Sequence, residues 1–300
     1  MAMPRRKLFP KIAVFILLLG GAAFFSLPGY VGPRMNPVVG TELGTVSDEA
    51  RELHGQILVA DLHADALLWN RDLTERGDWG HVDLPRMGEG RVGLQAFTVV
   101  TKTPRGMNID ATSGDSDNIT LLAVAQRWPT RTWRSLLQRA LYQSEKLRRV
   151  EAESGGGLRI LRTRRDLERL LAARAAADAR SRHETSGSTT DANAELPPVG
   201  AILGIEGAHA LDGELSSVDR LFDAGFRMIG ITHFFDNAVG GSAHGMEKGG
   251  LTPLGVQVVD RMAELETLRQ LAANANARLY LGFDRNGLHV DGSDAGRDGS

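Results

Sequence analysis

The fold is decided around the stretch Ile57-Leu58-Val59-Ala60-Asp61-Leu62-His63-Ala64-Asp65. Its apolar first part, Ile57 to Ala60, predicts a buried strand, and polar residues follow where that strand ends. His63 and Asp65 stand two residues apart there, so both side chains can turn toward one side. Imidazole and carboxylate groups are usual ligands of zinc in hydrolytic sites. Because H-x-D is a common tripeptide, the alternative is a core histidine beside a carboxylate that closes a turn.

Three further apolar runs follow at wide spacing, and each predicts a strand. They cover residues 93–100, 199–205 and 227–232. Helical patterns separate them, over residues 118–150 (interrupted near Pro129), 163–182 and 217–224. Thr252-Pro253 opens another helix, with threonine as the N-cap and proline at the first helical position. Strands that alternate with helices predict an α/β fold with a parallel sheet and helical crossovers.

Metal-compatible residues also follow the last two of these runs. Residues 199–205 lead into Glu206-Gly207-Ala208-His209, and residues 227–232 lead into His233. The C-terminal ends of successive parallel strands carry the active site of a (β/α)8 barrel. A carboxylate that leaves a buried strand needs a cation or several donors. Glu206 is therefore either a metal ligand or the partner of an arginine or lysine.

Composition excludes several kinds of site. The chain has 300 residues, enough for a large core, and no cysteine, which excludes disulfides, thiolate metal sites and cysteine nucleophiles. A net charge of -2, without an arginine stripe interleaved with aromatic residues, predicts no nucleic-acid partner.

The N-terminus predicts one membrane helix. Four basic residues precede the uncharged stretch 12–33, which is long enough to cross about 30 Å of hydrocarbon. Pro28 and Gly29 predict the end of this helix. No small-x-small cleavage site is evident, which favours an uncleaved signal-anchor over a cleaved signal peptide. The basic flank predicts a cytoplasmic N-terminus and a domain outside the cytoplasm, periplasmic or extracellular, or secreted if the segment is cleaved.

Five motifs follow one another between residues 53 and 265. They are Asp61-x-His63-x-Asp65, His81-Val82-Asp83-Leu84-Pro85, Gly204-Ile205-Glu206-Gly207-Ala208-His209, Gly225-Phe226-Arg227 through Thr232-His233, and Gly249-Gly250-Leu251-Thr252-Pro253-Leu254-Gly255. In this order they resemble the membrane dipeptidase (renal dipeptidase) family of zinc hydrolases. The resemblance implies a (β/α)8 TIM-like barrel, of which this chain carries the N-terminal portion.

The resemblance also implies roles for individual residues. His63 and Asp65 would bind the first of two zinc ions, and Glu206 would bridge both. A hydroxide shared by the two metals would attack the peptide carbonyl of a dipeptide. His233 matches the family histidine that contacts the substrate and the tetrahedral intermediate; its alternative is a core histidine at a strand end. His209 is expected to pack near the site without binding zinc.

Other candidate residues are expected to have ordinary roles. His81, His244 and His289 are predicted to be surface residues, and Asp83 is predicted to cap a helix or form a local pair. Asp284 ends a short apolar run and is not expected to be a ligand.

The chain departs from the family pattern after about residue 265. The family continues with Asp-x-Ser-His and Ser-His-Ser strands, and later an Arg-Asn segment and a catalytic aspartate; none of these is found here. Those histidines are the terminal ligands of the second zinc, which would keep only Glu206. A truncation is therefore expected, with four or five strands that leave the barrel open at an edge.

These observations divide the chain into four parts. Residues 1–33 are the basic segment and membrane helix, and residues 34–47 are a linker. Residues 48–272 form an incomplete metallo-dipeptidase barrel, in which 183–198 is a polar surface loop. Residues 273–300 are predicted to be a disordered tail.

The function expected from the resemblance is zinc-dependent hydrolysis of small peptides by a membrane-anchored enzyme. Family members often dimerise, so a homodimer is an expected assembly. One alternative is a catalytically defective, anchored remnant of the family. The other is an amidohydrolase of the same barrel type that acts on cyclic amides or esters, against which the H-x-D pattern counts, since H-x-H is usual there.

Overall fold

The computed structural model describes residues 8–38, 40, 44–185, 197–265, 282–284 and 287–289. Within them, five parallel strands form one sheet: β1 (Val59–Ala64), β2 (Val92–Val99), β3 (Leu158–Ile160), β4 (Val199–Ile205) and β5 (Phe226–Ile229). The order along the sheet is β1-β2-β4, and the far edge of β4 pairs with β3 along its first residues and with β5 along its last. The predicted α/β class with a parallel sheet is confirmed.

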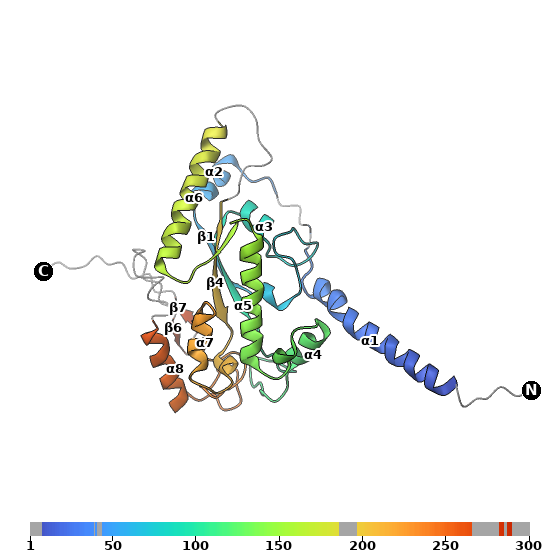
Figure 1. The fold of residues 1–300 in the computed structure, drawn as a ribbon. Coiled ribbons are helices and arrows are strands. Elements are labelled where there is room, and N and C mark those ends of the chain that lie inside the picture. Colours follow the sequence, from blue (N-terminus) through green and yellow to red (C-terminus); the bar gives the residue numbers. More distant parts are fainter. Residues whose placement is uncertain are drawn as a thin grey trace, which may run out of the picture.

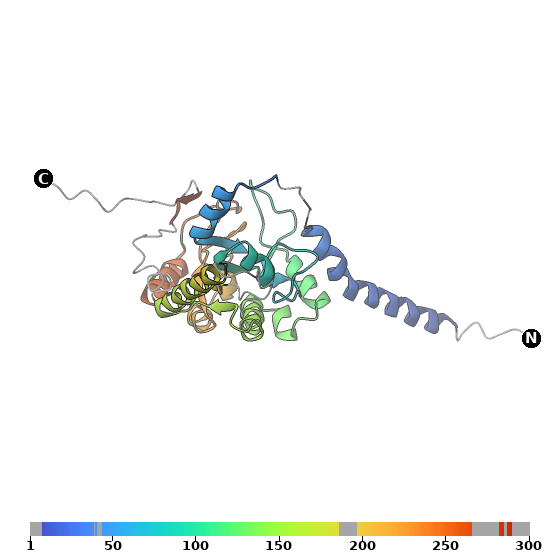
Figure 2. The same ribbon diagram turned by 90° about the horizontal axis from the view of Figure 1, so that it is seen from above.

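Helices connect the strands and cover one side of the sheet. The described helices are α1 (Leu8–Met35), α2 (Asp48–Gln56), α3 (Leu84–Glu89), α4 (Asn118–Ala125), α5 (Leu136–Glu153), α6 (Arg164–Thr185), α7 (Ser217–Asp223) and α8 (Pro253–Glu264), with 3-10 turns η2 (Ala66–Leu68), η3 (Thr130–Trp133) and η4 (Ala208–Leu211). Figure 2 shows α5, α6, α7 and α8 on the same side of the strands. Helices outside parallel strands in the order β1-β2-β4-β5 are the arrangement of the N-terminal portion of a (β/α)8 barrel.

The central strands β2 and β4 lie in the core. Phe97 and Val99 of β2 and Leu203 of β4 are fully buried, and Leu147 of α5 and Leu221 of α7 pack in the same cluster. The ends of these two strands are therefore held by close packing, which restricts the positions of the residues that follow them.

β1 differs from its prediction. It runs from Val59 to Ala64, so His63 lies inside the strand and not beyond its end. Among the strands that the structure describes it is also an edge strand, with β2 as its partner, and Ile57 and Leu58 ahead of it are 50% and 47% exposed. The apolar content of Ile57 to Ala60 predicted burial, but a strand at an edge lacks the second neighbour that would bury it.

The helices predicted over residues 118–150, 163–182 and 217–224 and after Thr252 are confirmed. α4 and α5 are separated by η3 after Pro129, and Thr252 caps α8 by accepting the Gly255 N–H at 3.0 Å. β3 was not predicted, because three residues are too few to show a period. The short strands β6 (Gly282–Asp284) and β7 (Gly287–His289) form an antiparallel pair.

α1 continues through Pro28 and Pro33 to Met35, so the prediction that Pro28 and Gly29 end the helix is wrong. The reason is tertiary: the domain holds the C-terminal end of the helix. Gly32 lies so close to Trp79 that a Cβ at position 32 would be 2.8 Å from the ring. The Gly80 N–H donates to the carbonyl of Asn36 at 2.8 Å.

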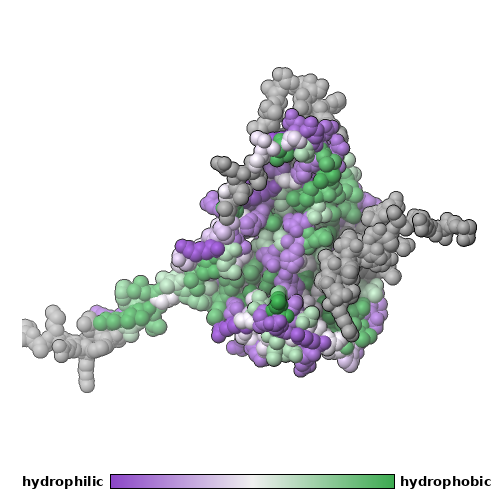
Figure 3. All heavy atoms as spheres, turned by 180° about the vertical axis from the view of Figure 1, so that it is seen from behind, coloured by the Kyte–Doolittle hydropathy of each residue, from purple (hydrophilic) through white to green (hydrophobic). Residues whose placement is uncertain are grey.

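The rest of α1 leaves the domain, as Figures 1 and 3 show. Residues 11–35 are long and apolar enough to cross a membrane, a test that signal sequences also pass. The predicted domain boundaries remain predictions. Part of the linker (39 and 41–43), part of the polar loop (186–196) and most of the tail lie outside the described residues.

Candidate metal centre

The ends of β1 and β4 bring the three predicted ligands together, although β2 lies between the two strands. His63 Nε2 is 2.7 Å from Glu206 Oε1 and 3.5 Å from Asp65 Oδ2. One ligand atom from each of the three side chains lies within 4.8 Å of the others. The sequence prediction that these residues converge at one end of the sheet is thus matched by the geometry.

Glu206 is positioned by a turn that requires glycine. β4 ends at Ile205, and Gly207 follows Glu206 with φ of 103°, a conformation that L side chains rarely adopt. A Cβ at Gly207 would also lie 2.6 Å from Nδ1 of His209. The Ala208 N–H then donates to the carbonyl of Ile231 at 3.2 Å, which ties the turn to the segment after β5.

The hydroxyl group of Thr98, on strand β2 between β1 and β4, orients Asp65. Thr98 of β2 donates its Oγ1–H to Asp65 Oδ1 at 2.5 Å, which leaves Oδ2 facing His63. Asp61 accepts the backbone N–H of His63 at 3.0 Å. Thr98 was not predicted from the sequence; the available signal was a hydroxyl in the otherwise apolar stretch from Ala96 to Val100.

Electrostatics distinguish the two interpretations of Glu206. Burial and the neighbouring charge of Asp65 raise the pKa of Glu206 to about 7, and His63 opposes the shift. No arginine or lysine in the described part of the chain forms an ion pair with Glu206; its partners are His63 and His233. A carboxylate that is 11% exposed beside a second carboxylate lacks a compensating cation. This donor set of one imidazole and two carboxylates fits a divalent metal ion.

His233 lies at the rim of the same cluster. Its Nε2 is 3.8 Å from Glu206 Oε2, and its ring packs edge-on against Phe234. The side chain is 30% exposed, so it is not a core histidine. Burial lowers the pKa of His233. The negative charge of Asp65 raises this pKa, and the nearby His63 and His244 lower it further. The neutral imidazole is therefore favoured.

The remaining candidates lie outside the cluster. His209 is buried and packs on Phe235 with ring centroids 4.8 Å apart, and burial lowers its pKa to about 3. His81 is exposed, as predicted. His244 is partly exposed, stacks on Phe234, and its Nδ1 lies 2.8 Å from the carbonyl oxygen of Ile109.

Asp83 has the structural role predicted for it. It is fully buried, accepts the Arg86 N–H at 3.0 Å at the start of α3, and pairs with Arg71 and Arg86. The side chains of His289 and Asp284 lie outside the described residues.

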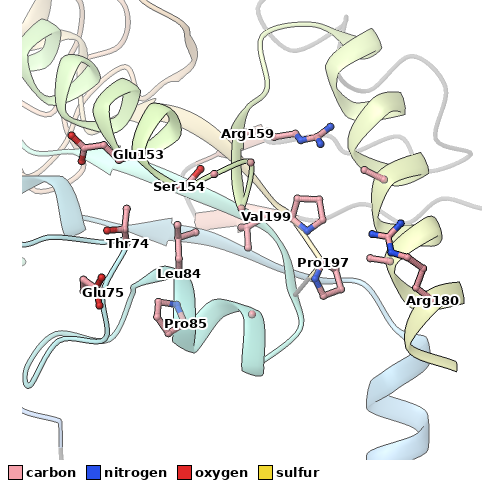
Figure 4. Close-up of a pocket in the computed structure, with 17 residues that line it drawn as sticks. Thr74, Glu75, Leu84, Pro85, Glu153, Ser154, Arg159, Arg180, Pro197 and Val199 are labelled. Carbon is pink, nitrogen blue, oxygen red and sulfur yellow. The ribbon is translucent and has the colours of Figure 1, made fainter. Parts of the chain in front are cut away.

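Two cavities lie near the sheet. One of ≈ 350 Å³ adjoins the cluster, with His63, Asp65, Asn36 and Trp79 in its lining, and this volume suits a small ligand. A larger one of ≈ 600 Å³ lies at the opposite end of the sheet, where β3 and β4 begin. Figure 4 shows that it has acidic side chains on one side and arginines on the other. Its lining contains no histidine.

Comparison with known proteins places the chain in a family. Residues 47–279 match the family described as membrane dipeptidase (peptidase family M19). The probable dipeptidase PvdM from Pseudomonas aeruginosa is 20% identical with a TM-score of 0.49, and the alignment covers 76% of this chain and 52% of that one. The dipeptidase AC, a metallo peptidase, is 23% identical (TM-score 0.43, 70% and 56% covered).

A metallo peptidase from Rhodobacter sphaeroides, liganded with a phosphinate mimic of the dipeptide L-Ala-D-Ala, is 21% identical (TM-score 0.40, 74% and 63% covered). The chain thus spans about half the length of the first of these proteins. The family match covers well over half of the 300 residues. The chain belongs to the membrane dipeptidase family.

Proposed function

We propose that this chain provides the metal-binding part of a metallodipeptidase that hydrolyses small peptides. The observation that carries the proposal is the cluster of His63, Asp65 and Glu206 in a chain of the membrane dipeptidase family. Glu206 supports it most strongly, because a buried carboxylate whose partners are imidazoles gains most from a cation.

His63, Asp65 and Glu206 would hold one divalent ion, which we propose to be zinc. The same donors also tolerate manganese and cobalt. When bound, such an ion supplies Lewis-acid polarisation of the scissile carbonyl and a lowered pKa for water. The family resemblance implies a second zinc, for which Glu206 would again be a ligand.

Other residues of the chain would position groups around that ion. Thr98 fixes the orientation of the Asp65 carboxylate through its hydroxyl. His233, with the neutral ring favoured, would donate its N–H to the oxygen of the scissile carbonyl as negative charge develops there. The ≈ 350 Å³ cavity beside His63 would receive part of the peptide.

We further propose that α1 anchors the domain at a membrane, with the domain outside the cytoplasm. The uncharged stretch 12–33 and the basic residues ahead of it support this proposal.

Hydrolysis of an unblocked dipeptide by the full chain in detergent is the test of this function. We expect zinc-dependent release of amino acids, its loss on treatment with a chelator, and its return when zinc is restored. Turnover that survives complete metal removal would contradict the proposal. Zinc binding without turnover would instead favour the alternative in which the chain binds metal and does not catalyse.

Replacing His233 by alanine is expected to lower kcat about 100-fold and leave zinc affinity within about threefold of the wild type, because the lost group stabilises charge and does not hold the ion. Zinc titration and steady-state kinetics on the same preparation separate the two effects. The exposed His54→Ala, on α2 and outside the lining of the cavity beside His63, is the matched control and should change neither quantity. A large loss of zinc affinity in His233→Ala would make His233 a ligand.

A further inference from the structure

Six of the eight residues of α4 are apolar and none is charged, yet the helix lies at the surface beside α1 (Figure 1). Ile119, Ala123 and Ala125 face the core, while Leu121 is 53% exposed. The apolar side chains of such a helix are normally enclosed by protein or by lipid. Protein covers only part of α4. Its neighbour α1 is long and apolar enough to cross a membrane, which indicates that lipid covers the rest.

The length of α1 sets the level of the membrane. A helix needs about 20 residues to cross about 30 Å of hydrocarbon, and the last charge before Arg34 is Lys11. Residues 11–20 are all exposed. Contact with the domain includes Phe25, over whose ring the Arg127 guanidinium lies at 5.2 Å.

The free part of the helix is therefore too short to cross the membrane alone. Residues 12–24 extend only about 20 Å at about 1.5 Å per residue. The remainder of the span overlaps the stretch that packs on Ala125, Gln126 and Arg127, at the C-terminal end of α4. A bilayer crossed by α1 must then reach the domain surface around α4.

The side chains exposed there suit lipid headgroups. Trp133 and Arg134 are exposed at the end of η3, a turn that follows Arg127 along the chain and contacts α4. Neither Arg127 nor Arg134 pairs with a carboxylate of the described residues, whereas Arg131 between them pairs with Glu145 at 2.6 Å. Tryptophan is enriched at membrane interfaces, and basic residues bind anionic headgroups.

We propose that Leu121, Arg127, Trp133 and Arg134, here called the α4 face, lie in the headgroup layer of the membrane that α1 crosses, with the two arginines toward anionic lipid. This inference rests on the proposed anchoring by α1. It also brings the metal cluster close to the membrane, since Asn36, directly after α1, lines the cavity beside His63.

The absence of cysteine from the chain allows a direct test. The full chain carrying Leu121→Cys is labelled with an environment-sensitive dye and reconstituted in nanodiscs that contain brominated lipid. Leu171→Cys is the matched control, an exposed leucine on α6, which lies away from α1 (Figure 1). We expect the bromolipid to quench the label at position 121 and not the label at position 171. Quenching of the label at position 121 no stronger than that at position 171 would overturn the proposal.

The lipid preference is tested in the same assay with anionic and zwitterionic nanodiscs. Anionic lipid should increase quenching at position 121, and Arg127→Gln with Arg134→Gln should remove that increase. Arg159→Gln, an exposed arginine on β3, should retain it. Equal quenching in both lipids would refute the role of the arginines.

Carbonate extraction of native membranes distinguishes failure of the proposed anchoring by α1 from failure of the proposed α4 face. Release of the chain would refute the anchoring and the α4 face together. Retention with a solvent-exposed label at position 121 would refute the α4 face alone.

Discussion

Glu206→Gln is expected to weaken zinc binding at least about 100-fold and to remove metal-dependent turnover. Removing a residue that only hydrogen-bonds to a metal ligand costs about 10–100-fold in metal affinity. Glu206→Gln removes the charge of a ligand itself, so its effect should be at least as large. The glutamine has nearly the same shape and can still accept a hydrogen bond from His63, so the effect isolates the charge. Isothermal titration with zinc, together with the dipeptide assay, measures both losses.

The same substitution is expected to stabilise the metal-free protein. The pKa of Glu206 in the fold, about 7, lies above its ordinary value of 4.5 because of burial and Asp65. The folded state therefore holds this proton more tightly, and the free energy of unfolding falls as pH rises from 4.5 through 7. Glutamine does not titrate, so metal-free Glu206→Gln should be more stable at pH 8, on the order of 2 kcal/mol. Below pH 4.5 the difference should vanish.

Urea unfolding of the chelated protein at several pH values measures this second effect. Glu214→Gln, an exposed carboxylate after η4, is the matched control and should alter neither zinc affinity nor stability. A ligand that costs stability without its metal is the signature of a functional site. Wild-type zinc affinity in Glu206→Gln would refute the metal role. Unchanged stability at pH 8 would show that the carboxylate is not desolvated.

The ligands could be predicted from sequence because each is fixed by a local pattern. Glu206 directly follows the apolar run that forms β4, and His63 and Asp65 come shortly after the apolar run in which β1 begins. Parallel strands bring their C-terminal ends to one edge of the sheet, so convergence follows once the strands are recognised.

The features that sequence analysis missed depend on tertiary neighbours. Thr98 reaches Asp65 only because β2 lies between β1 and β4, an order that no local period encodes. The burial of β1 was overestimated because its apolar content cannot reveal that it is an edge strand. α1 continues past Pro28 because Trp79, distant in sequence, packs on Gly32.

Arg139→Met is expected to lower the free energy of unfolding by about 3–5 kcal/mol, the cost of removing one partner from a buried ion pair. Arg139 on α5 is 1% exposed and donates to five oxygens. They are the carbonyls of Thr101, Thr132 and Trp133, the hydroxyl of Thr120 and the carboxylate of Asp117. These acceptors belong to the segment just after β2, to α4 with its N-cap, and to η3, so the substitution leaves three segments without their donor.

Urea unfolding of the full chain in detergent, followed by tryptophan fluorescence, measures the loss. Arg131→Met is the matched control, because its pair with Glu145 is nearly half exposed and should contribute less than about 1 kcal/mol. Arg139→Lys should recover only part of the loss, since an ammonium group has three donors in place of five. A loss for Arg139→Met no larger than that for Arg131→Met would show that the five contacts do not hold these segments.

The pH dependence of the loss identifies its source. Burial alone would raise the pKa of Asp117, but hydrogen bonds from Thr120 and Arg139 hold it below its ordinary value of 3.8. The ion pair therefore stabilises the fold above pH 3.8 and is lost as the pH falls through the lower folded-state pKa. The difference between wild type and Arg139→Met should narrow in that acid range, while the part due to the carbonyl acceptors persists. If the difference in free energy of unfolding between wild type and Arg139→Met does not change with pH, the carbonyls alone provide the stabilisation and Asp117 contributes nothing to it.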